Sequence, residues 1–264
     1  MVLNSGMISD DAYHRILITK GSILSRAKDV YNREGFWPLV LISFSFLKEI
    51  CLVTIPDSIW CFRHKIFESS KTFEFQGKTY HYFFHPYCTT WRNERTVAVP
   101  IIWNFVKRYE AKGKKILEVG NTLSYYFEVS HDILDKYEIT KGVINDDVVD
   151  YKSSKKYDLI VSVVTLPEVG WYESPRDPTK TTRALENLKT LLSPDGEIAV
   201  VLNLGINPEF DKSLENKTIK FAKQGYLRHL KGYRWQESDW EDVRHTKYDK
   251  SVPTANAVMV AIIR

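Results

Sequence analysis

The segment KKILEVGNTLSYY, residues 114–126, decides which fold the chain is expected to have. Two lysines lead into a short apolar run that reaches Glu118 and Gly120, and a polar stretch from Asn121 to Ser124 follows. Nucleotide-binding α/β folds place their ligand loop after such a strand. Those loops usually carry more glycine, so the segment is either a cofactor loop that has lost glycines or an ordinary strand-to-helix turn.

Length and composition indicate a globular protein and argue against a nucleic-acid binder or a disulfide-bonded protein. The chain has 264 residues, of which 44% are hydrophobic and 27% charged, enough for one large domain with or without an appendage. Its net charge of +4 is spread along the chain, unlike the clustered basic stripe of a nucleic-acid binder. The three cysteines, Cys51, Cys61 and Cys88, form no Cys-x-x-Cys pair, which predicts a reducing, cytoplasmic location without disulfides. Charges scattered through residues 1–20 argue against a signal peptide.

Residues 1–70 are predicted to form an N-terminal helical appendage. Its window 36–55, FWPLVLISFSFLKEICLVTI, is the most hydrophobic stretch, but Lys48 and Glu49 interrupt it, which argues against a membrane span. Basic residues in and around the window allow a helix lying in the membrane interface. A buried or partner-facing helix is the other interpretation, so peripheral membrane contact through 36–55 is left open.

The remaining residues, 71–264, are predicted to form one domain with its core at 112–264. A short hairpin is expected around Gln76-Gly77, because aromatic residues alternate on both sides of that pair. His81 and His85 follow without a third ligand at a sensible spacing, so no metal site is predicted. A helix is expected over 89–112, capped by Thr89 or Thr90, kinked or split at Pro100 and ended by Gly113.

From residue 115 onward short apolar strands alternate with helical patterns. The order predicts an α/β fold with a doubly wound, mostly parallel sheet covered on both faces. The stretch 211–245 is polar and mixed, and no strand is assigned to it. The expected strands are KILEV, HDILDKYE, KGVINDDVVDY, YDLIVSVVT, SPDGEIAVVLNLG and ANAVMVAIIR, with an amphipathic helix, TKTTRALENLKTLL, before the fifth.

Acidic residues follow the first three of these strands, at the edge where open parallel sheets bind ligands. Asp135, after the second strand, is placed to accept ribose hydroxyls, and an acid near the end of the third, Asp147, is placed to meet an exocyclic amine. Glu118 in the first strand would repel a pyrophosphate, which argues against NAD or FAD. It suits an adenosine-containing ligand that carries a positive centre and an ammonium group.

This order resembles the class I S-adenosylmethionine-dependent methyltransferases. ILEVGNTLS matches the first motif at Glu118 and Gly120, and the match continues with Asp135, with Asp147-Val148, with YDLIVSVVTLPEVGW and with LLSPDGEIAVVL. The resemblance covers about residues 90–264. It implies a Rossmann-like sheet of seven strands and S-adenosylmethionine as the cofactor. The cofactor-binding residues that it implies are Glu118, Gly120, Asn121, Thr122, Asp135, Asp147, Val148 and Thr165.

Two further segments are similar to a subgroup associated with glycan and surface-polysaccharide assembly. They are YCTTWRNERTVAVPI, before the first strand, and PEVGWYESPRDPTK, after the fourth. This similarity implies a small-molecule or glycan acceptor that is methylated on a hydroxyl. Glu168, where many relatives have histidine, is the expected general base. The acceptor-binding residues expected with it are Trp171, Tyr172, Arg92, Arg95 and Asn203.

Departures from the motifs leave alternatives. Thr122 and Ser124 stand where relatives usually have glycine; both are small, and Asn121 tolerates positive φ, so a cofactor loop is still predicted. A catalytically silent scaffold with this fold is one alternative. An RNA methyltransferase that binds through the basic, aromatic stretch 217–235 is another, against which the acids at 237–242 argue. The acceptor's identity and the oligomeric state are left open.

Overall fold

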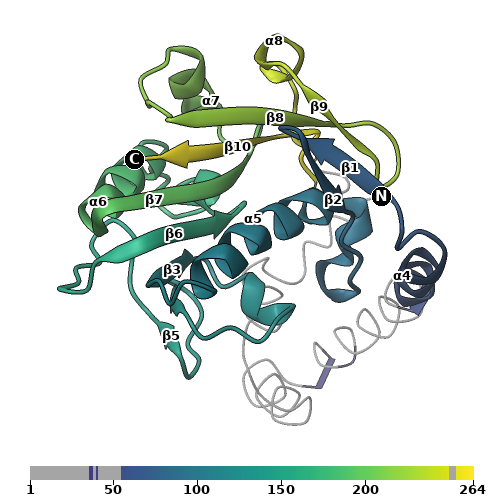
Figure 1. Cartoon of the computed structure of the whole chain (residues 1–264), viewed down its shortest axis with the longest axis horizontal. Coiled ribbons are helices and arrows are strands. Elements are labelled where there is room, and N and C mark those ends of the chain that lie inside the picture. Colours follow the sequence, from purple (N-terminus) through teal and green to yellow (C-terminus); the bar gives the residue numbers. More distant parts are fainter. Residues whose placement is uncertain (1–35, 38–39, 41–54, 250–253) are drawn as a thin grey trace. The chain divides into compact units, whose positions relative to one another are not determined.

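The computed structural model describes residues 36–37, 40, 55–249 and 254–264 (Figure 1). The chain divides into two compact units, 1–62 and 63–264, and all strands of the described residues belong to the second. Helix α4, Ile55–Phe67, opens the continuously described part. Among the described residues, no helix is both long and apolar enough to cross a bilayer. The window 36–55 lies almost wholly outside the described residues, and the 1–70 appendage stays a prediction.

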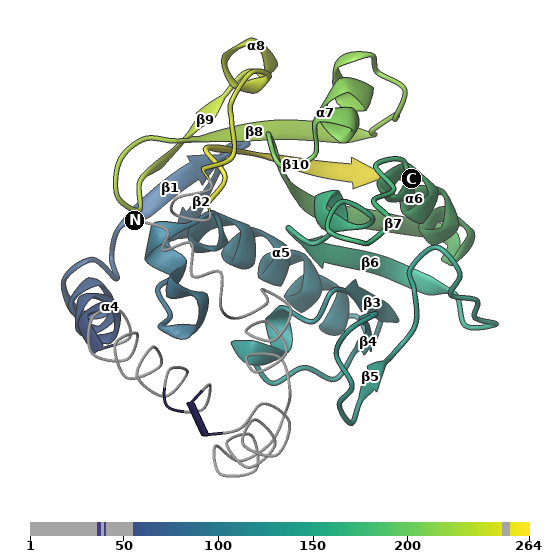
Figure 2. The same cartoon turned by 180° about the vertical axis from the view of Figure 1, so that it is seen from behind.

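The core of the second unit is an eight-stranded sheet in the order β5-β4-β3-β6-β7-β10-β8-β9 (Figure 2). The first five of these strands are parallel, and numbered along the chain they have the order 3-2-1-4-5 of a doubly wound fold. The predicted α/β class is therefore confirmed. The strands are β3 (Ile116–Val119), β4 (Asp132–Leu134), β5 (Val143–Ile144), β6 (Tyr157–Val163), β7 (Leu192–Asn203), β8 (Lys223–His229), β9 (Trp235–Ser238) and β10 (Ala257–Ile263).

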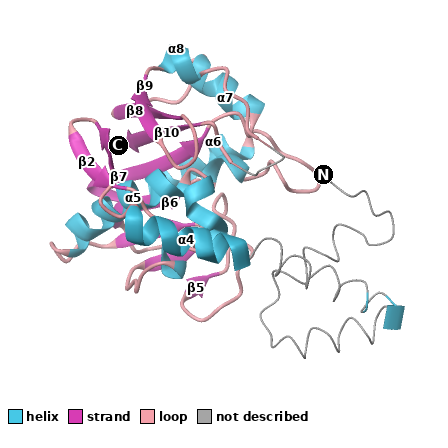
Figure 3. Ribbon diagram, turned by 90° about the vertical axis from the view of Figure 1, so that its right-hand side faces the viewer, coloured by secondary structure: helices cyan, strands magenta, loops and turns pink. Residues whose placement is uncertain are grey.

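The predicted number of seven strands is wrong by one, because β9 adds an antiparallel edge strand to β8. The stretch 211–245, left without strands by its polar composition, contains both β8 and β9, the end of α7 (Pro208–Glu215) and the short helix α8 (Trp240–Val243) (Figure 3). None of its aromatic residues is fully exposed to solvent. Tyr226 and Trp235 are buried, and the Tyr233 hydroxyl donates to Glu68. This weakens the RNA interpretation, which needs exposed rings for base stacking.

Apolar residues cover both faces of the sheet. On β7, Ile198, Val200 and Leu202 pack in one cluster with residues of α6 (Lys180–Thr190) and α7. The alternate residues, Ala199 and Val201, are also buried and point to the opposite face. Helix α5 (Arg95–Glu110) contacts β3, β6 and β7, so it covers that second face.

Helix α5 differs from its prediction at its start, and it is not split at Pro100. Thr89 and Thr90 do not cap it; they lie in the preceding 3-10 segment η2, Tyr87–Arg92. The helix runs unbroken through Pro100. Proline at position 100 leaves the Thr96 carbonyl without its usual helical donor. The backbone N–H of Phe83 fills that place at 3.0 Å, which explains why the helix tolerates the proline.

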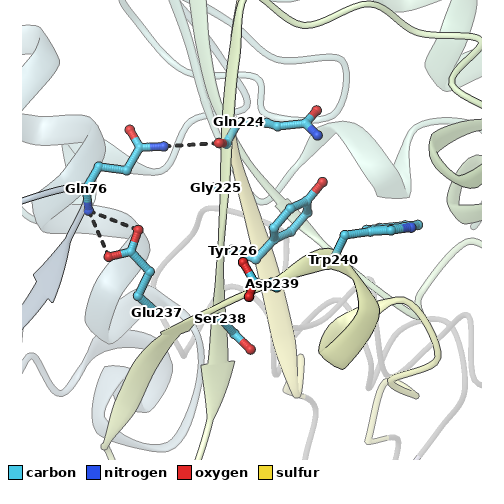
Figure 4. A pocket seen from close by; sticks show the side chains of 8 residues that line it. All are labelled: Gln76, Gln224, Gly225, Tyr226, Glu237, Ser238, Asp239 and Trp240. Atoms are coloured by element: carbon cyan, nitrogen blue, oxygen red, sulfur yellow. Dashed lines mark hydrogen bonds between the residues drawn. The ribbon is translucent and has the colours of Figure 1, made fainter.

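The predicted hairpin is confirmed as β1 (Thr72–Phe75) and β2 (Lys78–His81). Gln76 and Gly77 both have positive φ, as a two-residue hairpin turn requires. The turn docks on β8, where a Cβ at Gly225 would lie 2.6 Å from Gln76 Nε2. Gln76 also donates its backbone N–H to the Glu237 carboxylate, beside a hollow of about 490 Å³ (Figure 4). This hollow lies at the start of β8 and contains none of the predicted site residues.

Candidate functional site

The strand order reverses between β3 and β6, and the loops that follow these two strands touch. Gly120 has φ +84, and a Cβ on it would lie 2.2 Å from Thr165 Oγ1. Thr165 immediately precedes the 3-10 turn η4, Leu166–Glu168. Doubly wound folds bind their ligands at this switch point. The structure therefore brings together Gly120 and Thr165, two of the predicted cofactor-binding residues.

Glu118 shapes the loop that follows β3. Its side chain is fully buried, and Oε1 accepts the backbone N–H groups of Thr122 and Leu123 at 2.9 and 2.8 Å. Oε2 lies 3.0 Å from Nε2 of His131, a residue that the sequence prediction missed. The protein itself thus supplies partners to both oxygens, where the sequence analysis expected a ligand ammonium to do so.

Missing glycines do not prevent the loop from forming. Thr122 has φ −110, and within 120–124 positive φ occurs at Gly120 alone. Glycine is therefore required at one position of this loop, and Asn121 does not adopt the positive φ that was considered for it. The turn after β3 is therefore well formed without further glycine.

Asp135, at the end of β4, holds the same loop from the neighbouring strand. Its Oδ2 accepts the Asn121 N–H at 3.0 Å, and its Oδ1 accepts the N–H groups of Tyr137 and Glu138, each at 2.9 Å. A carboxylate has about four lone-pair positions, so these three bonds leave about one for a ligand hydroxyl. Asn121 and Asp135, predicted to act together, are neighbours.

Asp147 belongs to a compact cluster of charges beside the buried Val148. Its Oδ2 accepts from the ammonium groups of Lys136 at 2.9 Å and Lys180 at 2.6 Å, and both lysines also contact Glu173. Burial would raise the pKa of Asp147, but the hydrogen bonds from the two lysines outweigh it and lower the pKa to about 2. Sequence reasoning missed the other three members of the cluster, Lys136, Glu173 and Lys180. The amphipathic pattern of α6 gave no sign that its first residue, Lys180, is buried.

Lys180→Met is expected to lower the free energy of unfolding by about 1–3 kcal/mol, because it removes the buried ammonium group and leaves the more exposed Lys136 to pair with Asp147 and Glu173. Urea unfolding at neutral pH measures this change. The matched control is Lys189→Met on the same helix, whose ion pair with the exposed Glu186 is expected to contribute about 1 kcal/mol or less. Equal effects of the two variants would show that the cluster does not stabilise the fold.

Glu168, in η4, lies close to Arg95 and Glu94 at the start of α5. The pKa of Glu168 is raised to about 7, mainly because the carboxyl group is shielded from water. The Arg95 guanidinium lowers this pKa and the Glu94 carboxylate raises it, both to a smaller extent. The two segments that resemble the glycan-associated subgroup thus come together in space. A carboxyl group with a pKa near neutrality can take up and release a proton under physiological conditions.

Arg95 and Tyr126 present buried polar atoms that have no partner among the described residues. Arg95 Nε and the Tyr126 hydroxyl are both shielded from solvent without a hydrogen bond, and no described carboxylate forms an ion pair with Arg95. Burial would lower the pKa of Arg95, but the nearby Glu94 carboxylate keeps it raised. Buried polar groups normally have partners, so these two point to a ligand group or a bound water. Tyr126 is a site residue that the sequence analysis missed.

Glu94, which lies between Arg92 and Arg95 in the sequence, is buried and so does not belong to a surface network of charges. Its carboxylate accepts from Asn203 Nδ2 at 3.1 Å, from the Thr254 hydroxyl and from the Ala255 N–H at 3.0 Å. Asn203, at the end of β7, is thereby fixed with its Oδ1 buried and unbonded. Asn203, a predicted acceptor-binding residue, is thus hydrogen-bonded to Glu94, the residue that precedes Arg95. Its amide oxygen remains able to accept a hydrogen bond.

Strained backbone flanks this group of residues. Cys88, Thr89 and Val164 have φ of 54, 41 and 56, a region that residues other than glycine rarely enter and that is most unfavourable for the β-branched Thr89 and Val164. Asn93 holds the first two near α5, because it donates to the Cys88 carbonyl at 2.7 Å and accepts the Arg95 N–H at 3.0 Å. Such strain persists where the surrounding structure enforces it, which is most common at functional sites.

The remaining predicted acceptor residues are more exposed. Tyr172 is 65% exposed, Arg92 is exposed, and the Trp171 ring stacks with the Arg176 guanidinium at 4.1 Å from its centroid. Tyr87 and Tyr125, stacked at 4.4 Å, were not anticipated. Among the described residues, no group of three or more histidine, cysteine or acidic side chains is arranged to hold a metal ion.

No protein-family model and no curated protein matches the sequence. Among solved structures, the chain is similar to the N-methyltransferase NodS from Bradyrhizobium japonicum WM9 in complex with S-adenosyl-L-homocysteine, at 10% identity and a TM-score of 0.38, over 66% of this chain and 93% of that one. It is also similar to the glycopeptide N-methyltransferase MtfA, at 9% identity and a TM-score of 0.32, over 65% of this chain and 92% of that one. The mitomycin 7-O-methyltransferase MmcR is similar at 12% identity and a TM-score of 0.32, over 58% of this chain and 49% of that one. Likeness this distant says nothing about substrate, and the fold assignment rests on the strand order.

Proposed function

We propose that the chain transfers a methyl group from S-adenosylmethionine to a hydroxyl group of a sugar or another small molecule. The observation that carries this proposal is Glu168, a partly buried carboxyl group with its pKa raised to about 7 at the switch point of the sheet. A neutral hydroxyl needs a general base to become a good nucleophile. Glu168 is suited to that role because it gains its proton near neutral pH.

The residues of the β3, β4 and β5 loops fit the proposed cofactor. Asp135 has about one lone-pair position left for a ribose hydroxyl, and Asp147 Oδ1, which accepts only the Val149 N–H among the described groups, can take the adenine amine. Gly120 keeps the loop in contact with Thr165. When bound, S-adenosylmethionine supplies an electrophilic methyl group on a sulfonium. The chain's own contribution is to align the acceptor with that methyl and to remove its proton.

Arg95 is proposed to bind an anionic or hydrogen-bond-accepting group of the ligands. Its guanidinium forms no described ion pair, and a carboxylate or phosphate would complement it. The sugar acceptor is supported by the resemblance of the segments around Arg95 and Glu168 to the glycan-associated subgroup, and by tyrosines such as Tyr172 that can stack on sugar rings. The cytoplasmic location and the membrane contact through 36–55 remain predictions.

The proposal is tested by incubating the purified chain with methyl-labelled S-adenosylmethionine and a panel of nucleotide-linked and lipid-linked sugars. Label transfer to a hydroxyl is the expected result. Cofactor binding without transfer to any sugar, together with label transfer to total RNA that falls steeply with salt, would support the RNA alternative. Cofactor binding without any turnover would support the silent scaffold.

A further inference from the structure

His131 contacts the carboxylate that shapes the loop after β3. Its Nε2 lies 3.0 Å from Glu118 Oε2, and both side chains are essentially closed to solvent, at 2% and 0% exposure. An ionised carboxylate can only accept, so Nε2 must carry the hydrogen. The other nitrogen, Nδ1, lies 3.9 Å from Glu110 Oε1, which is beyond hydrogen-bond distance.

The strand register places this histidine where it can reach Glu118. In the parallel pairing of β3 with β4, Glu118 is opposite Ile133. His131 comes two residues before Ile133, so its side chain lies on the same face of the sheet. Helix α5 covers this face and ends at Glu110. The contact therefore follows from the fold.

We infer that His131 is a positioning residue for the cofactor loop, an inference that rests on the proposed function for its link to cofactor binding. One oxygen of Glu118 holds the N–H groups of Thr122 and Leu123, and the other is anchored by His131. Without the histidine, the second oxygen is buried with no donor, which penalises the carboxylate in its present orientation. The carboxylate then turns or takes up water, and the loop loses the acceptor that fixes both amides.

The test compares His131→Leu, which removes the donor, with His131→Gln, which keeps an N–H donor on the side chain. Amide hydrogen exchange of residues 116–127 is measured on the ligand-free chain, and S-adenosylhomocysteine is titrated by calorimetry. In His131→Leu, exchange at Thr122 and Leu123 is expected to rise about tenfold and the affinity to fall about tenfold. His131→Gln is expected to restore most of both. His81→Leu, at an exposed histidine of β2, is the control and leaves both unchanged.

Two results would overturn the inference. Unchanged exchange at Thr122 and Leu123 in His131→Leu would show that the loop does not depend on the histidine. A uniform rise of exchange across the sheet, β7 and β10 included, would show a general structural role. If the wild type binds no S-adenosylhomocysteine, the proposed function fails, while the exchange measurement on the ligand-free chain still decides the role of His131.

Discussion

Glu168→Gln is expected to lower kcat by about 10²–10⁴-fold while the affinity for S-adenosylhomocysteine stays within about twofold, because a glutamine cannot accept the acceptor's proton. The same variant is expected to be more stable than the wild type above pH 7. The folded-state pKa of Glu168 is raised from 4.5 to about 7, so ionising the carboxyl in the folded protein costs up to about 3 kcal/mol at high pH, and glutamine avoids that cost.

The pH dependence has a definite sign. Because the base form of Glu168 is the carboxylate, the kcat of the wild type should rise with pH through about 7 and level off above it. The stability contributed by the neutral carboxyl is fully present below pH 4.5 and is lost as the pH rises through 7. Glu186→Gln, at an exposed position of α6, is the control. An active Glu168→Gln variant with the wild-type pH profile would exclude Glu168 as the base.

Gly120→Ala is expected to abolish cofactor binding and to destabilise the protein by about 2–5 kcal/mol, from left-handed strain of about 1–2 kcal/mol and a steric clash of about 1–3 kcal/mol. The added Cβ would lie 2.2 Å from Thr165 Oγ1 and 2.8 Å from Thr165 Cβ, so rotating the threonine does not remove the overlap. Denaturant unfolding and calorimetric titration with S-adenosylhomocysteine measure the two effects.

Gly142→Ala separates the clash from the backbone strain. Gly142 has φ +90, close to the +84 of Gly120, and a Cβ there meets nothing within 4 Å. It is therefore expected to cost only about 1–2 kcal/mol and to leave cofactor binding in place. If Gly120→Ala behaved like Gly142→Ala, the close contact between the β3 and β6 loops would not matter for the site.

The parallel half of the sheet could be predicted because its strands are apolar on both faces and its acids stand at their ends. KILEV and YDLIVSVVT became parallel strands, and the equally apolar ANAVMVAIIR became the antiparallel strand β10. Strands β8 and β9 were missed because both are largely polar: only the adjacent Tyr226 and Leu227 are buried in β8, so no alternating pattern marks it, and β9 is a short edge strand. Local sequence pattern also predicted that α5 begins at residue 89, whereas it begins at Arg95. The hydrogen bond from the Phe83 N–H to the Thr96 carbonyl, a tertiary contact, helps to position this start.

The roles of the individual carboxylates could be predicted less well than the strands. Glu118 and Asp135 were identified by position, but their partners are backbone N–H groups of a loop whose shape no pattern reveals. Tyr126 and His131 carry no motif of their own, and they reach the site only because the chain turns after β3 and because β4 pairs in one register. The cluster of Lys136, Glu173 and Lys180 joins residues up to 44 positions apart, so charge patterning along the chain could not reveal it.

The central claim is that S-adenosylmethionine binds at the loops where β3 and β6 end. Calorimetric titration of the purified chain with S-adenosylmethionine, run in parallel on Asp135→Ala and Gly142→Ala, tests it most directly. We expect micromolar binding by the wild type and by Gly142→Ala, and its loss in Asp135→Ala, where the carboxylate that holds the Asn121 N–H is removed. No binding by the wild type, or equal binding by Asp135→Ala, would contradict the account.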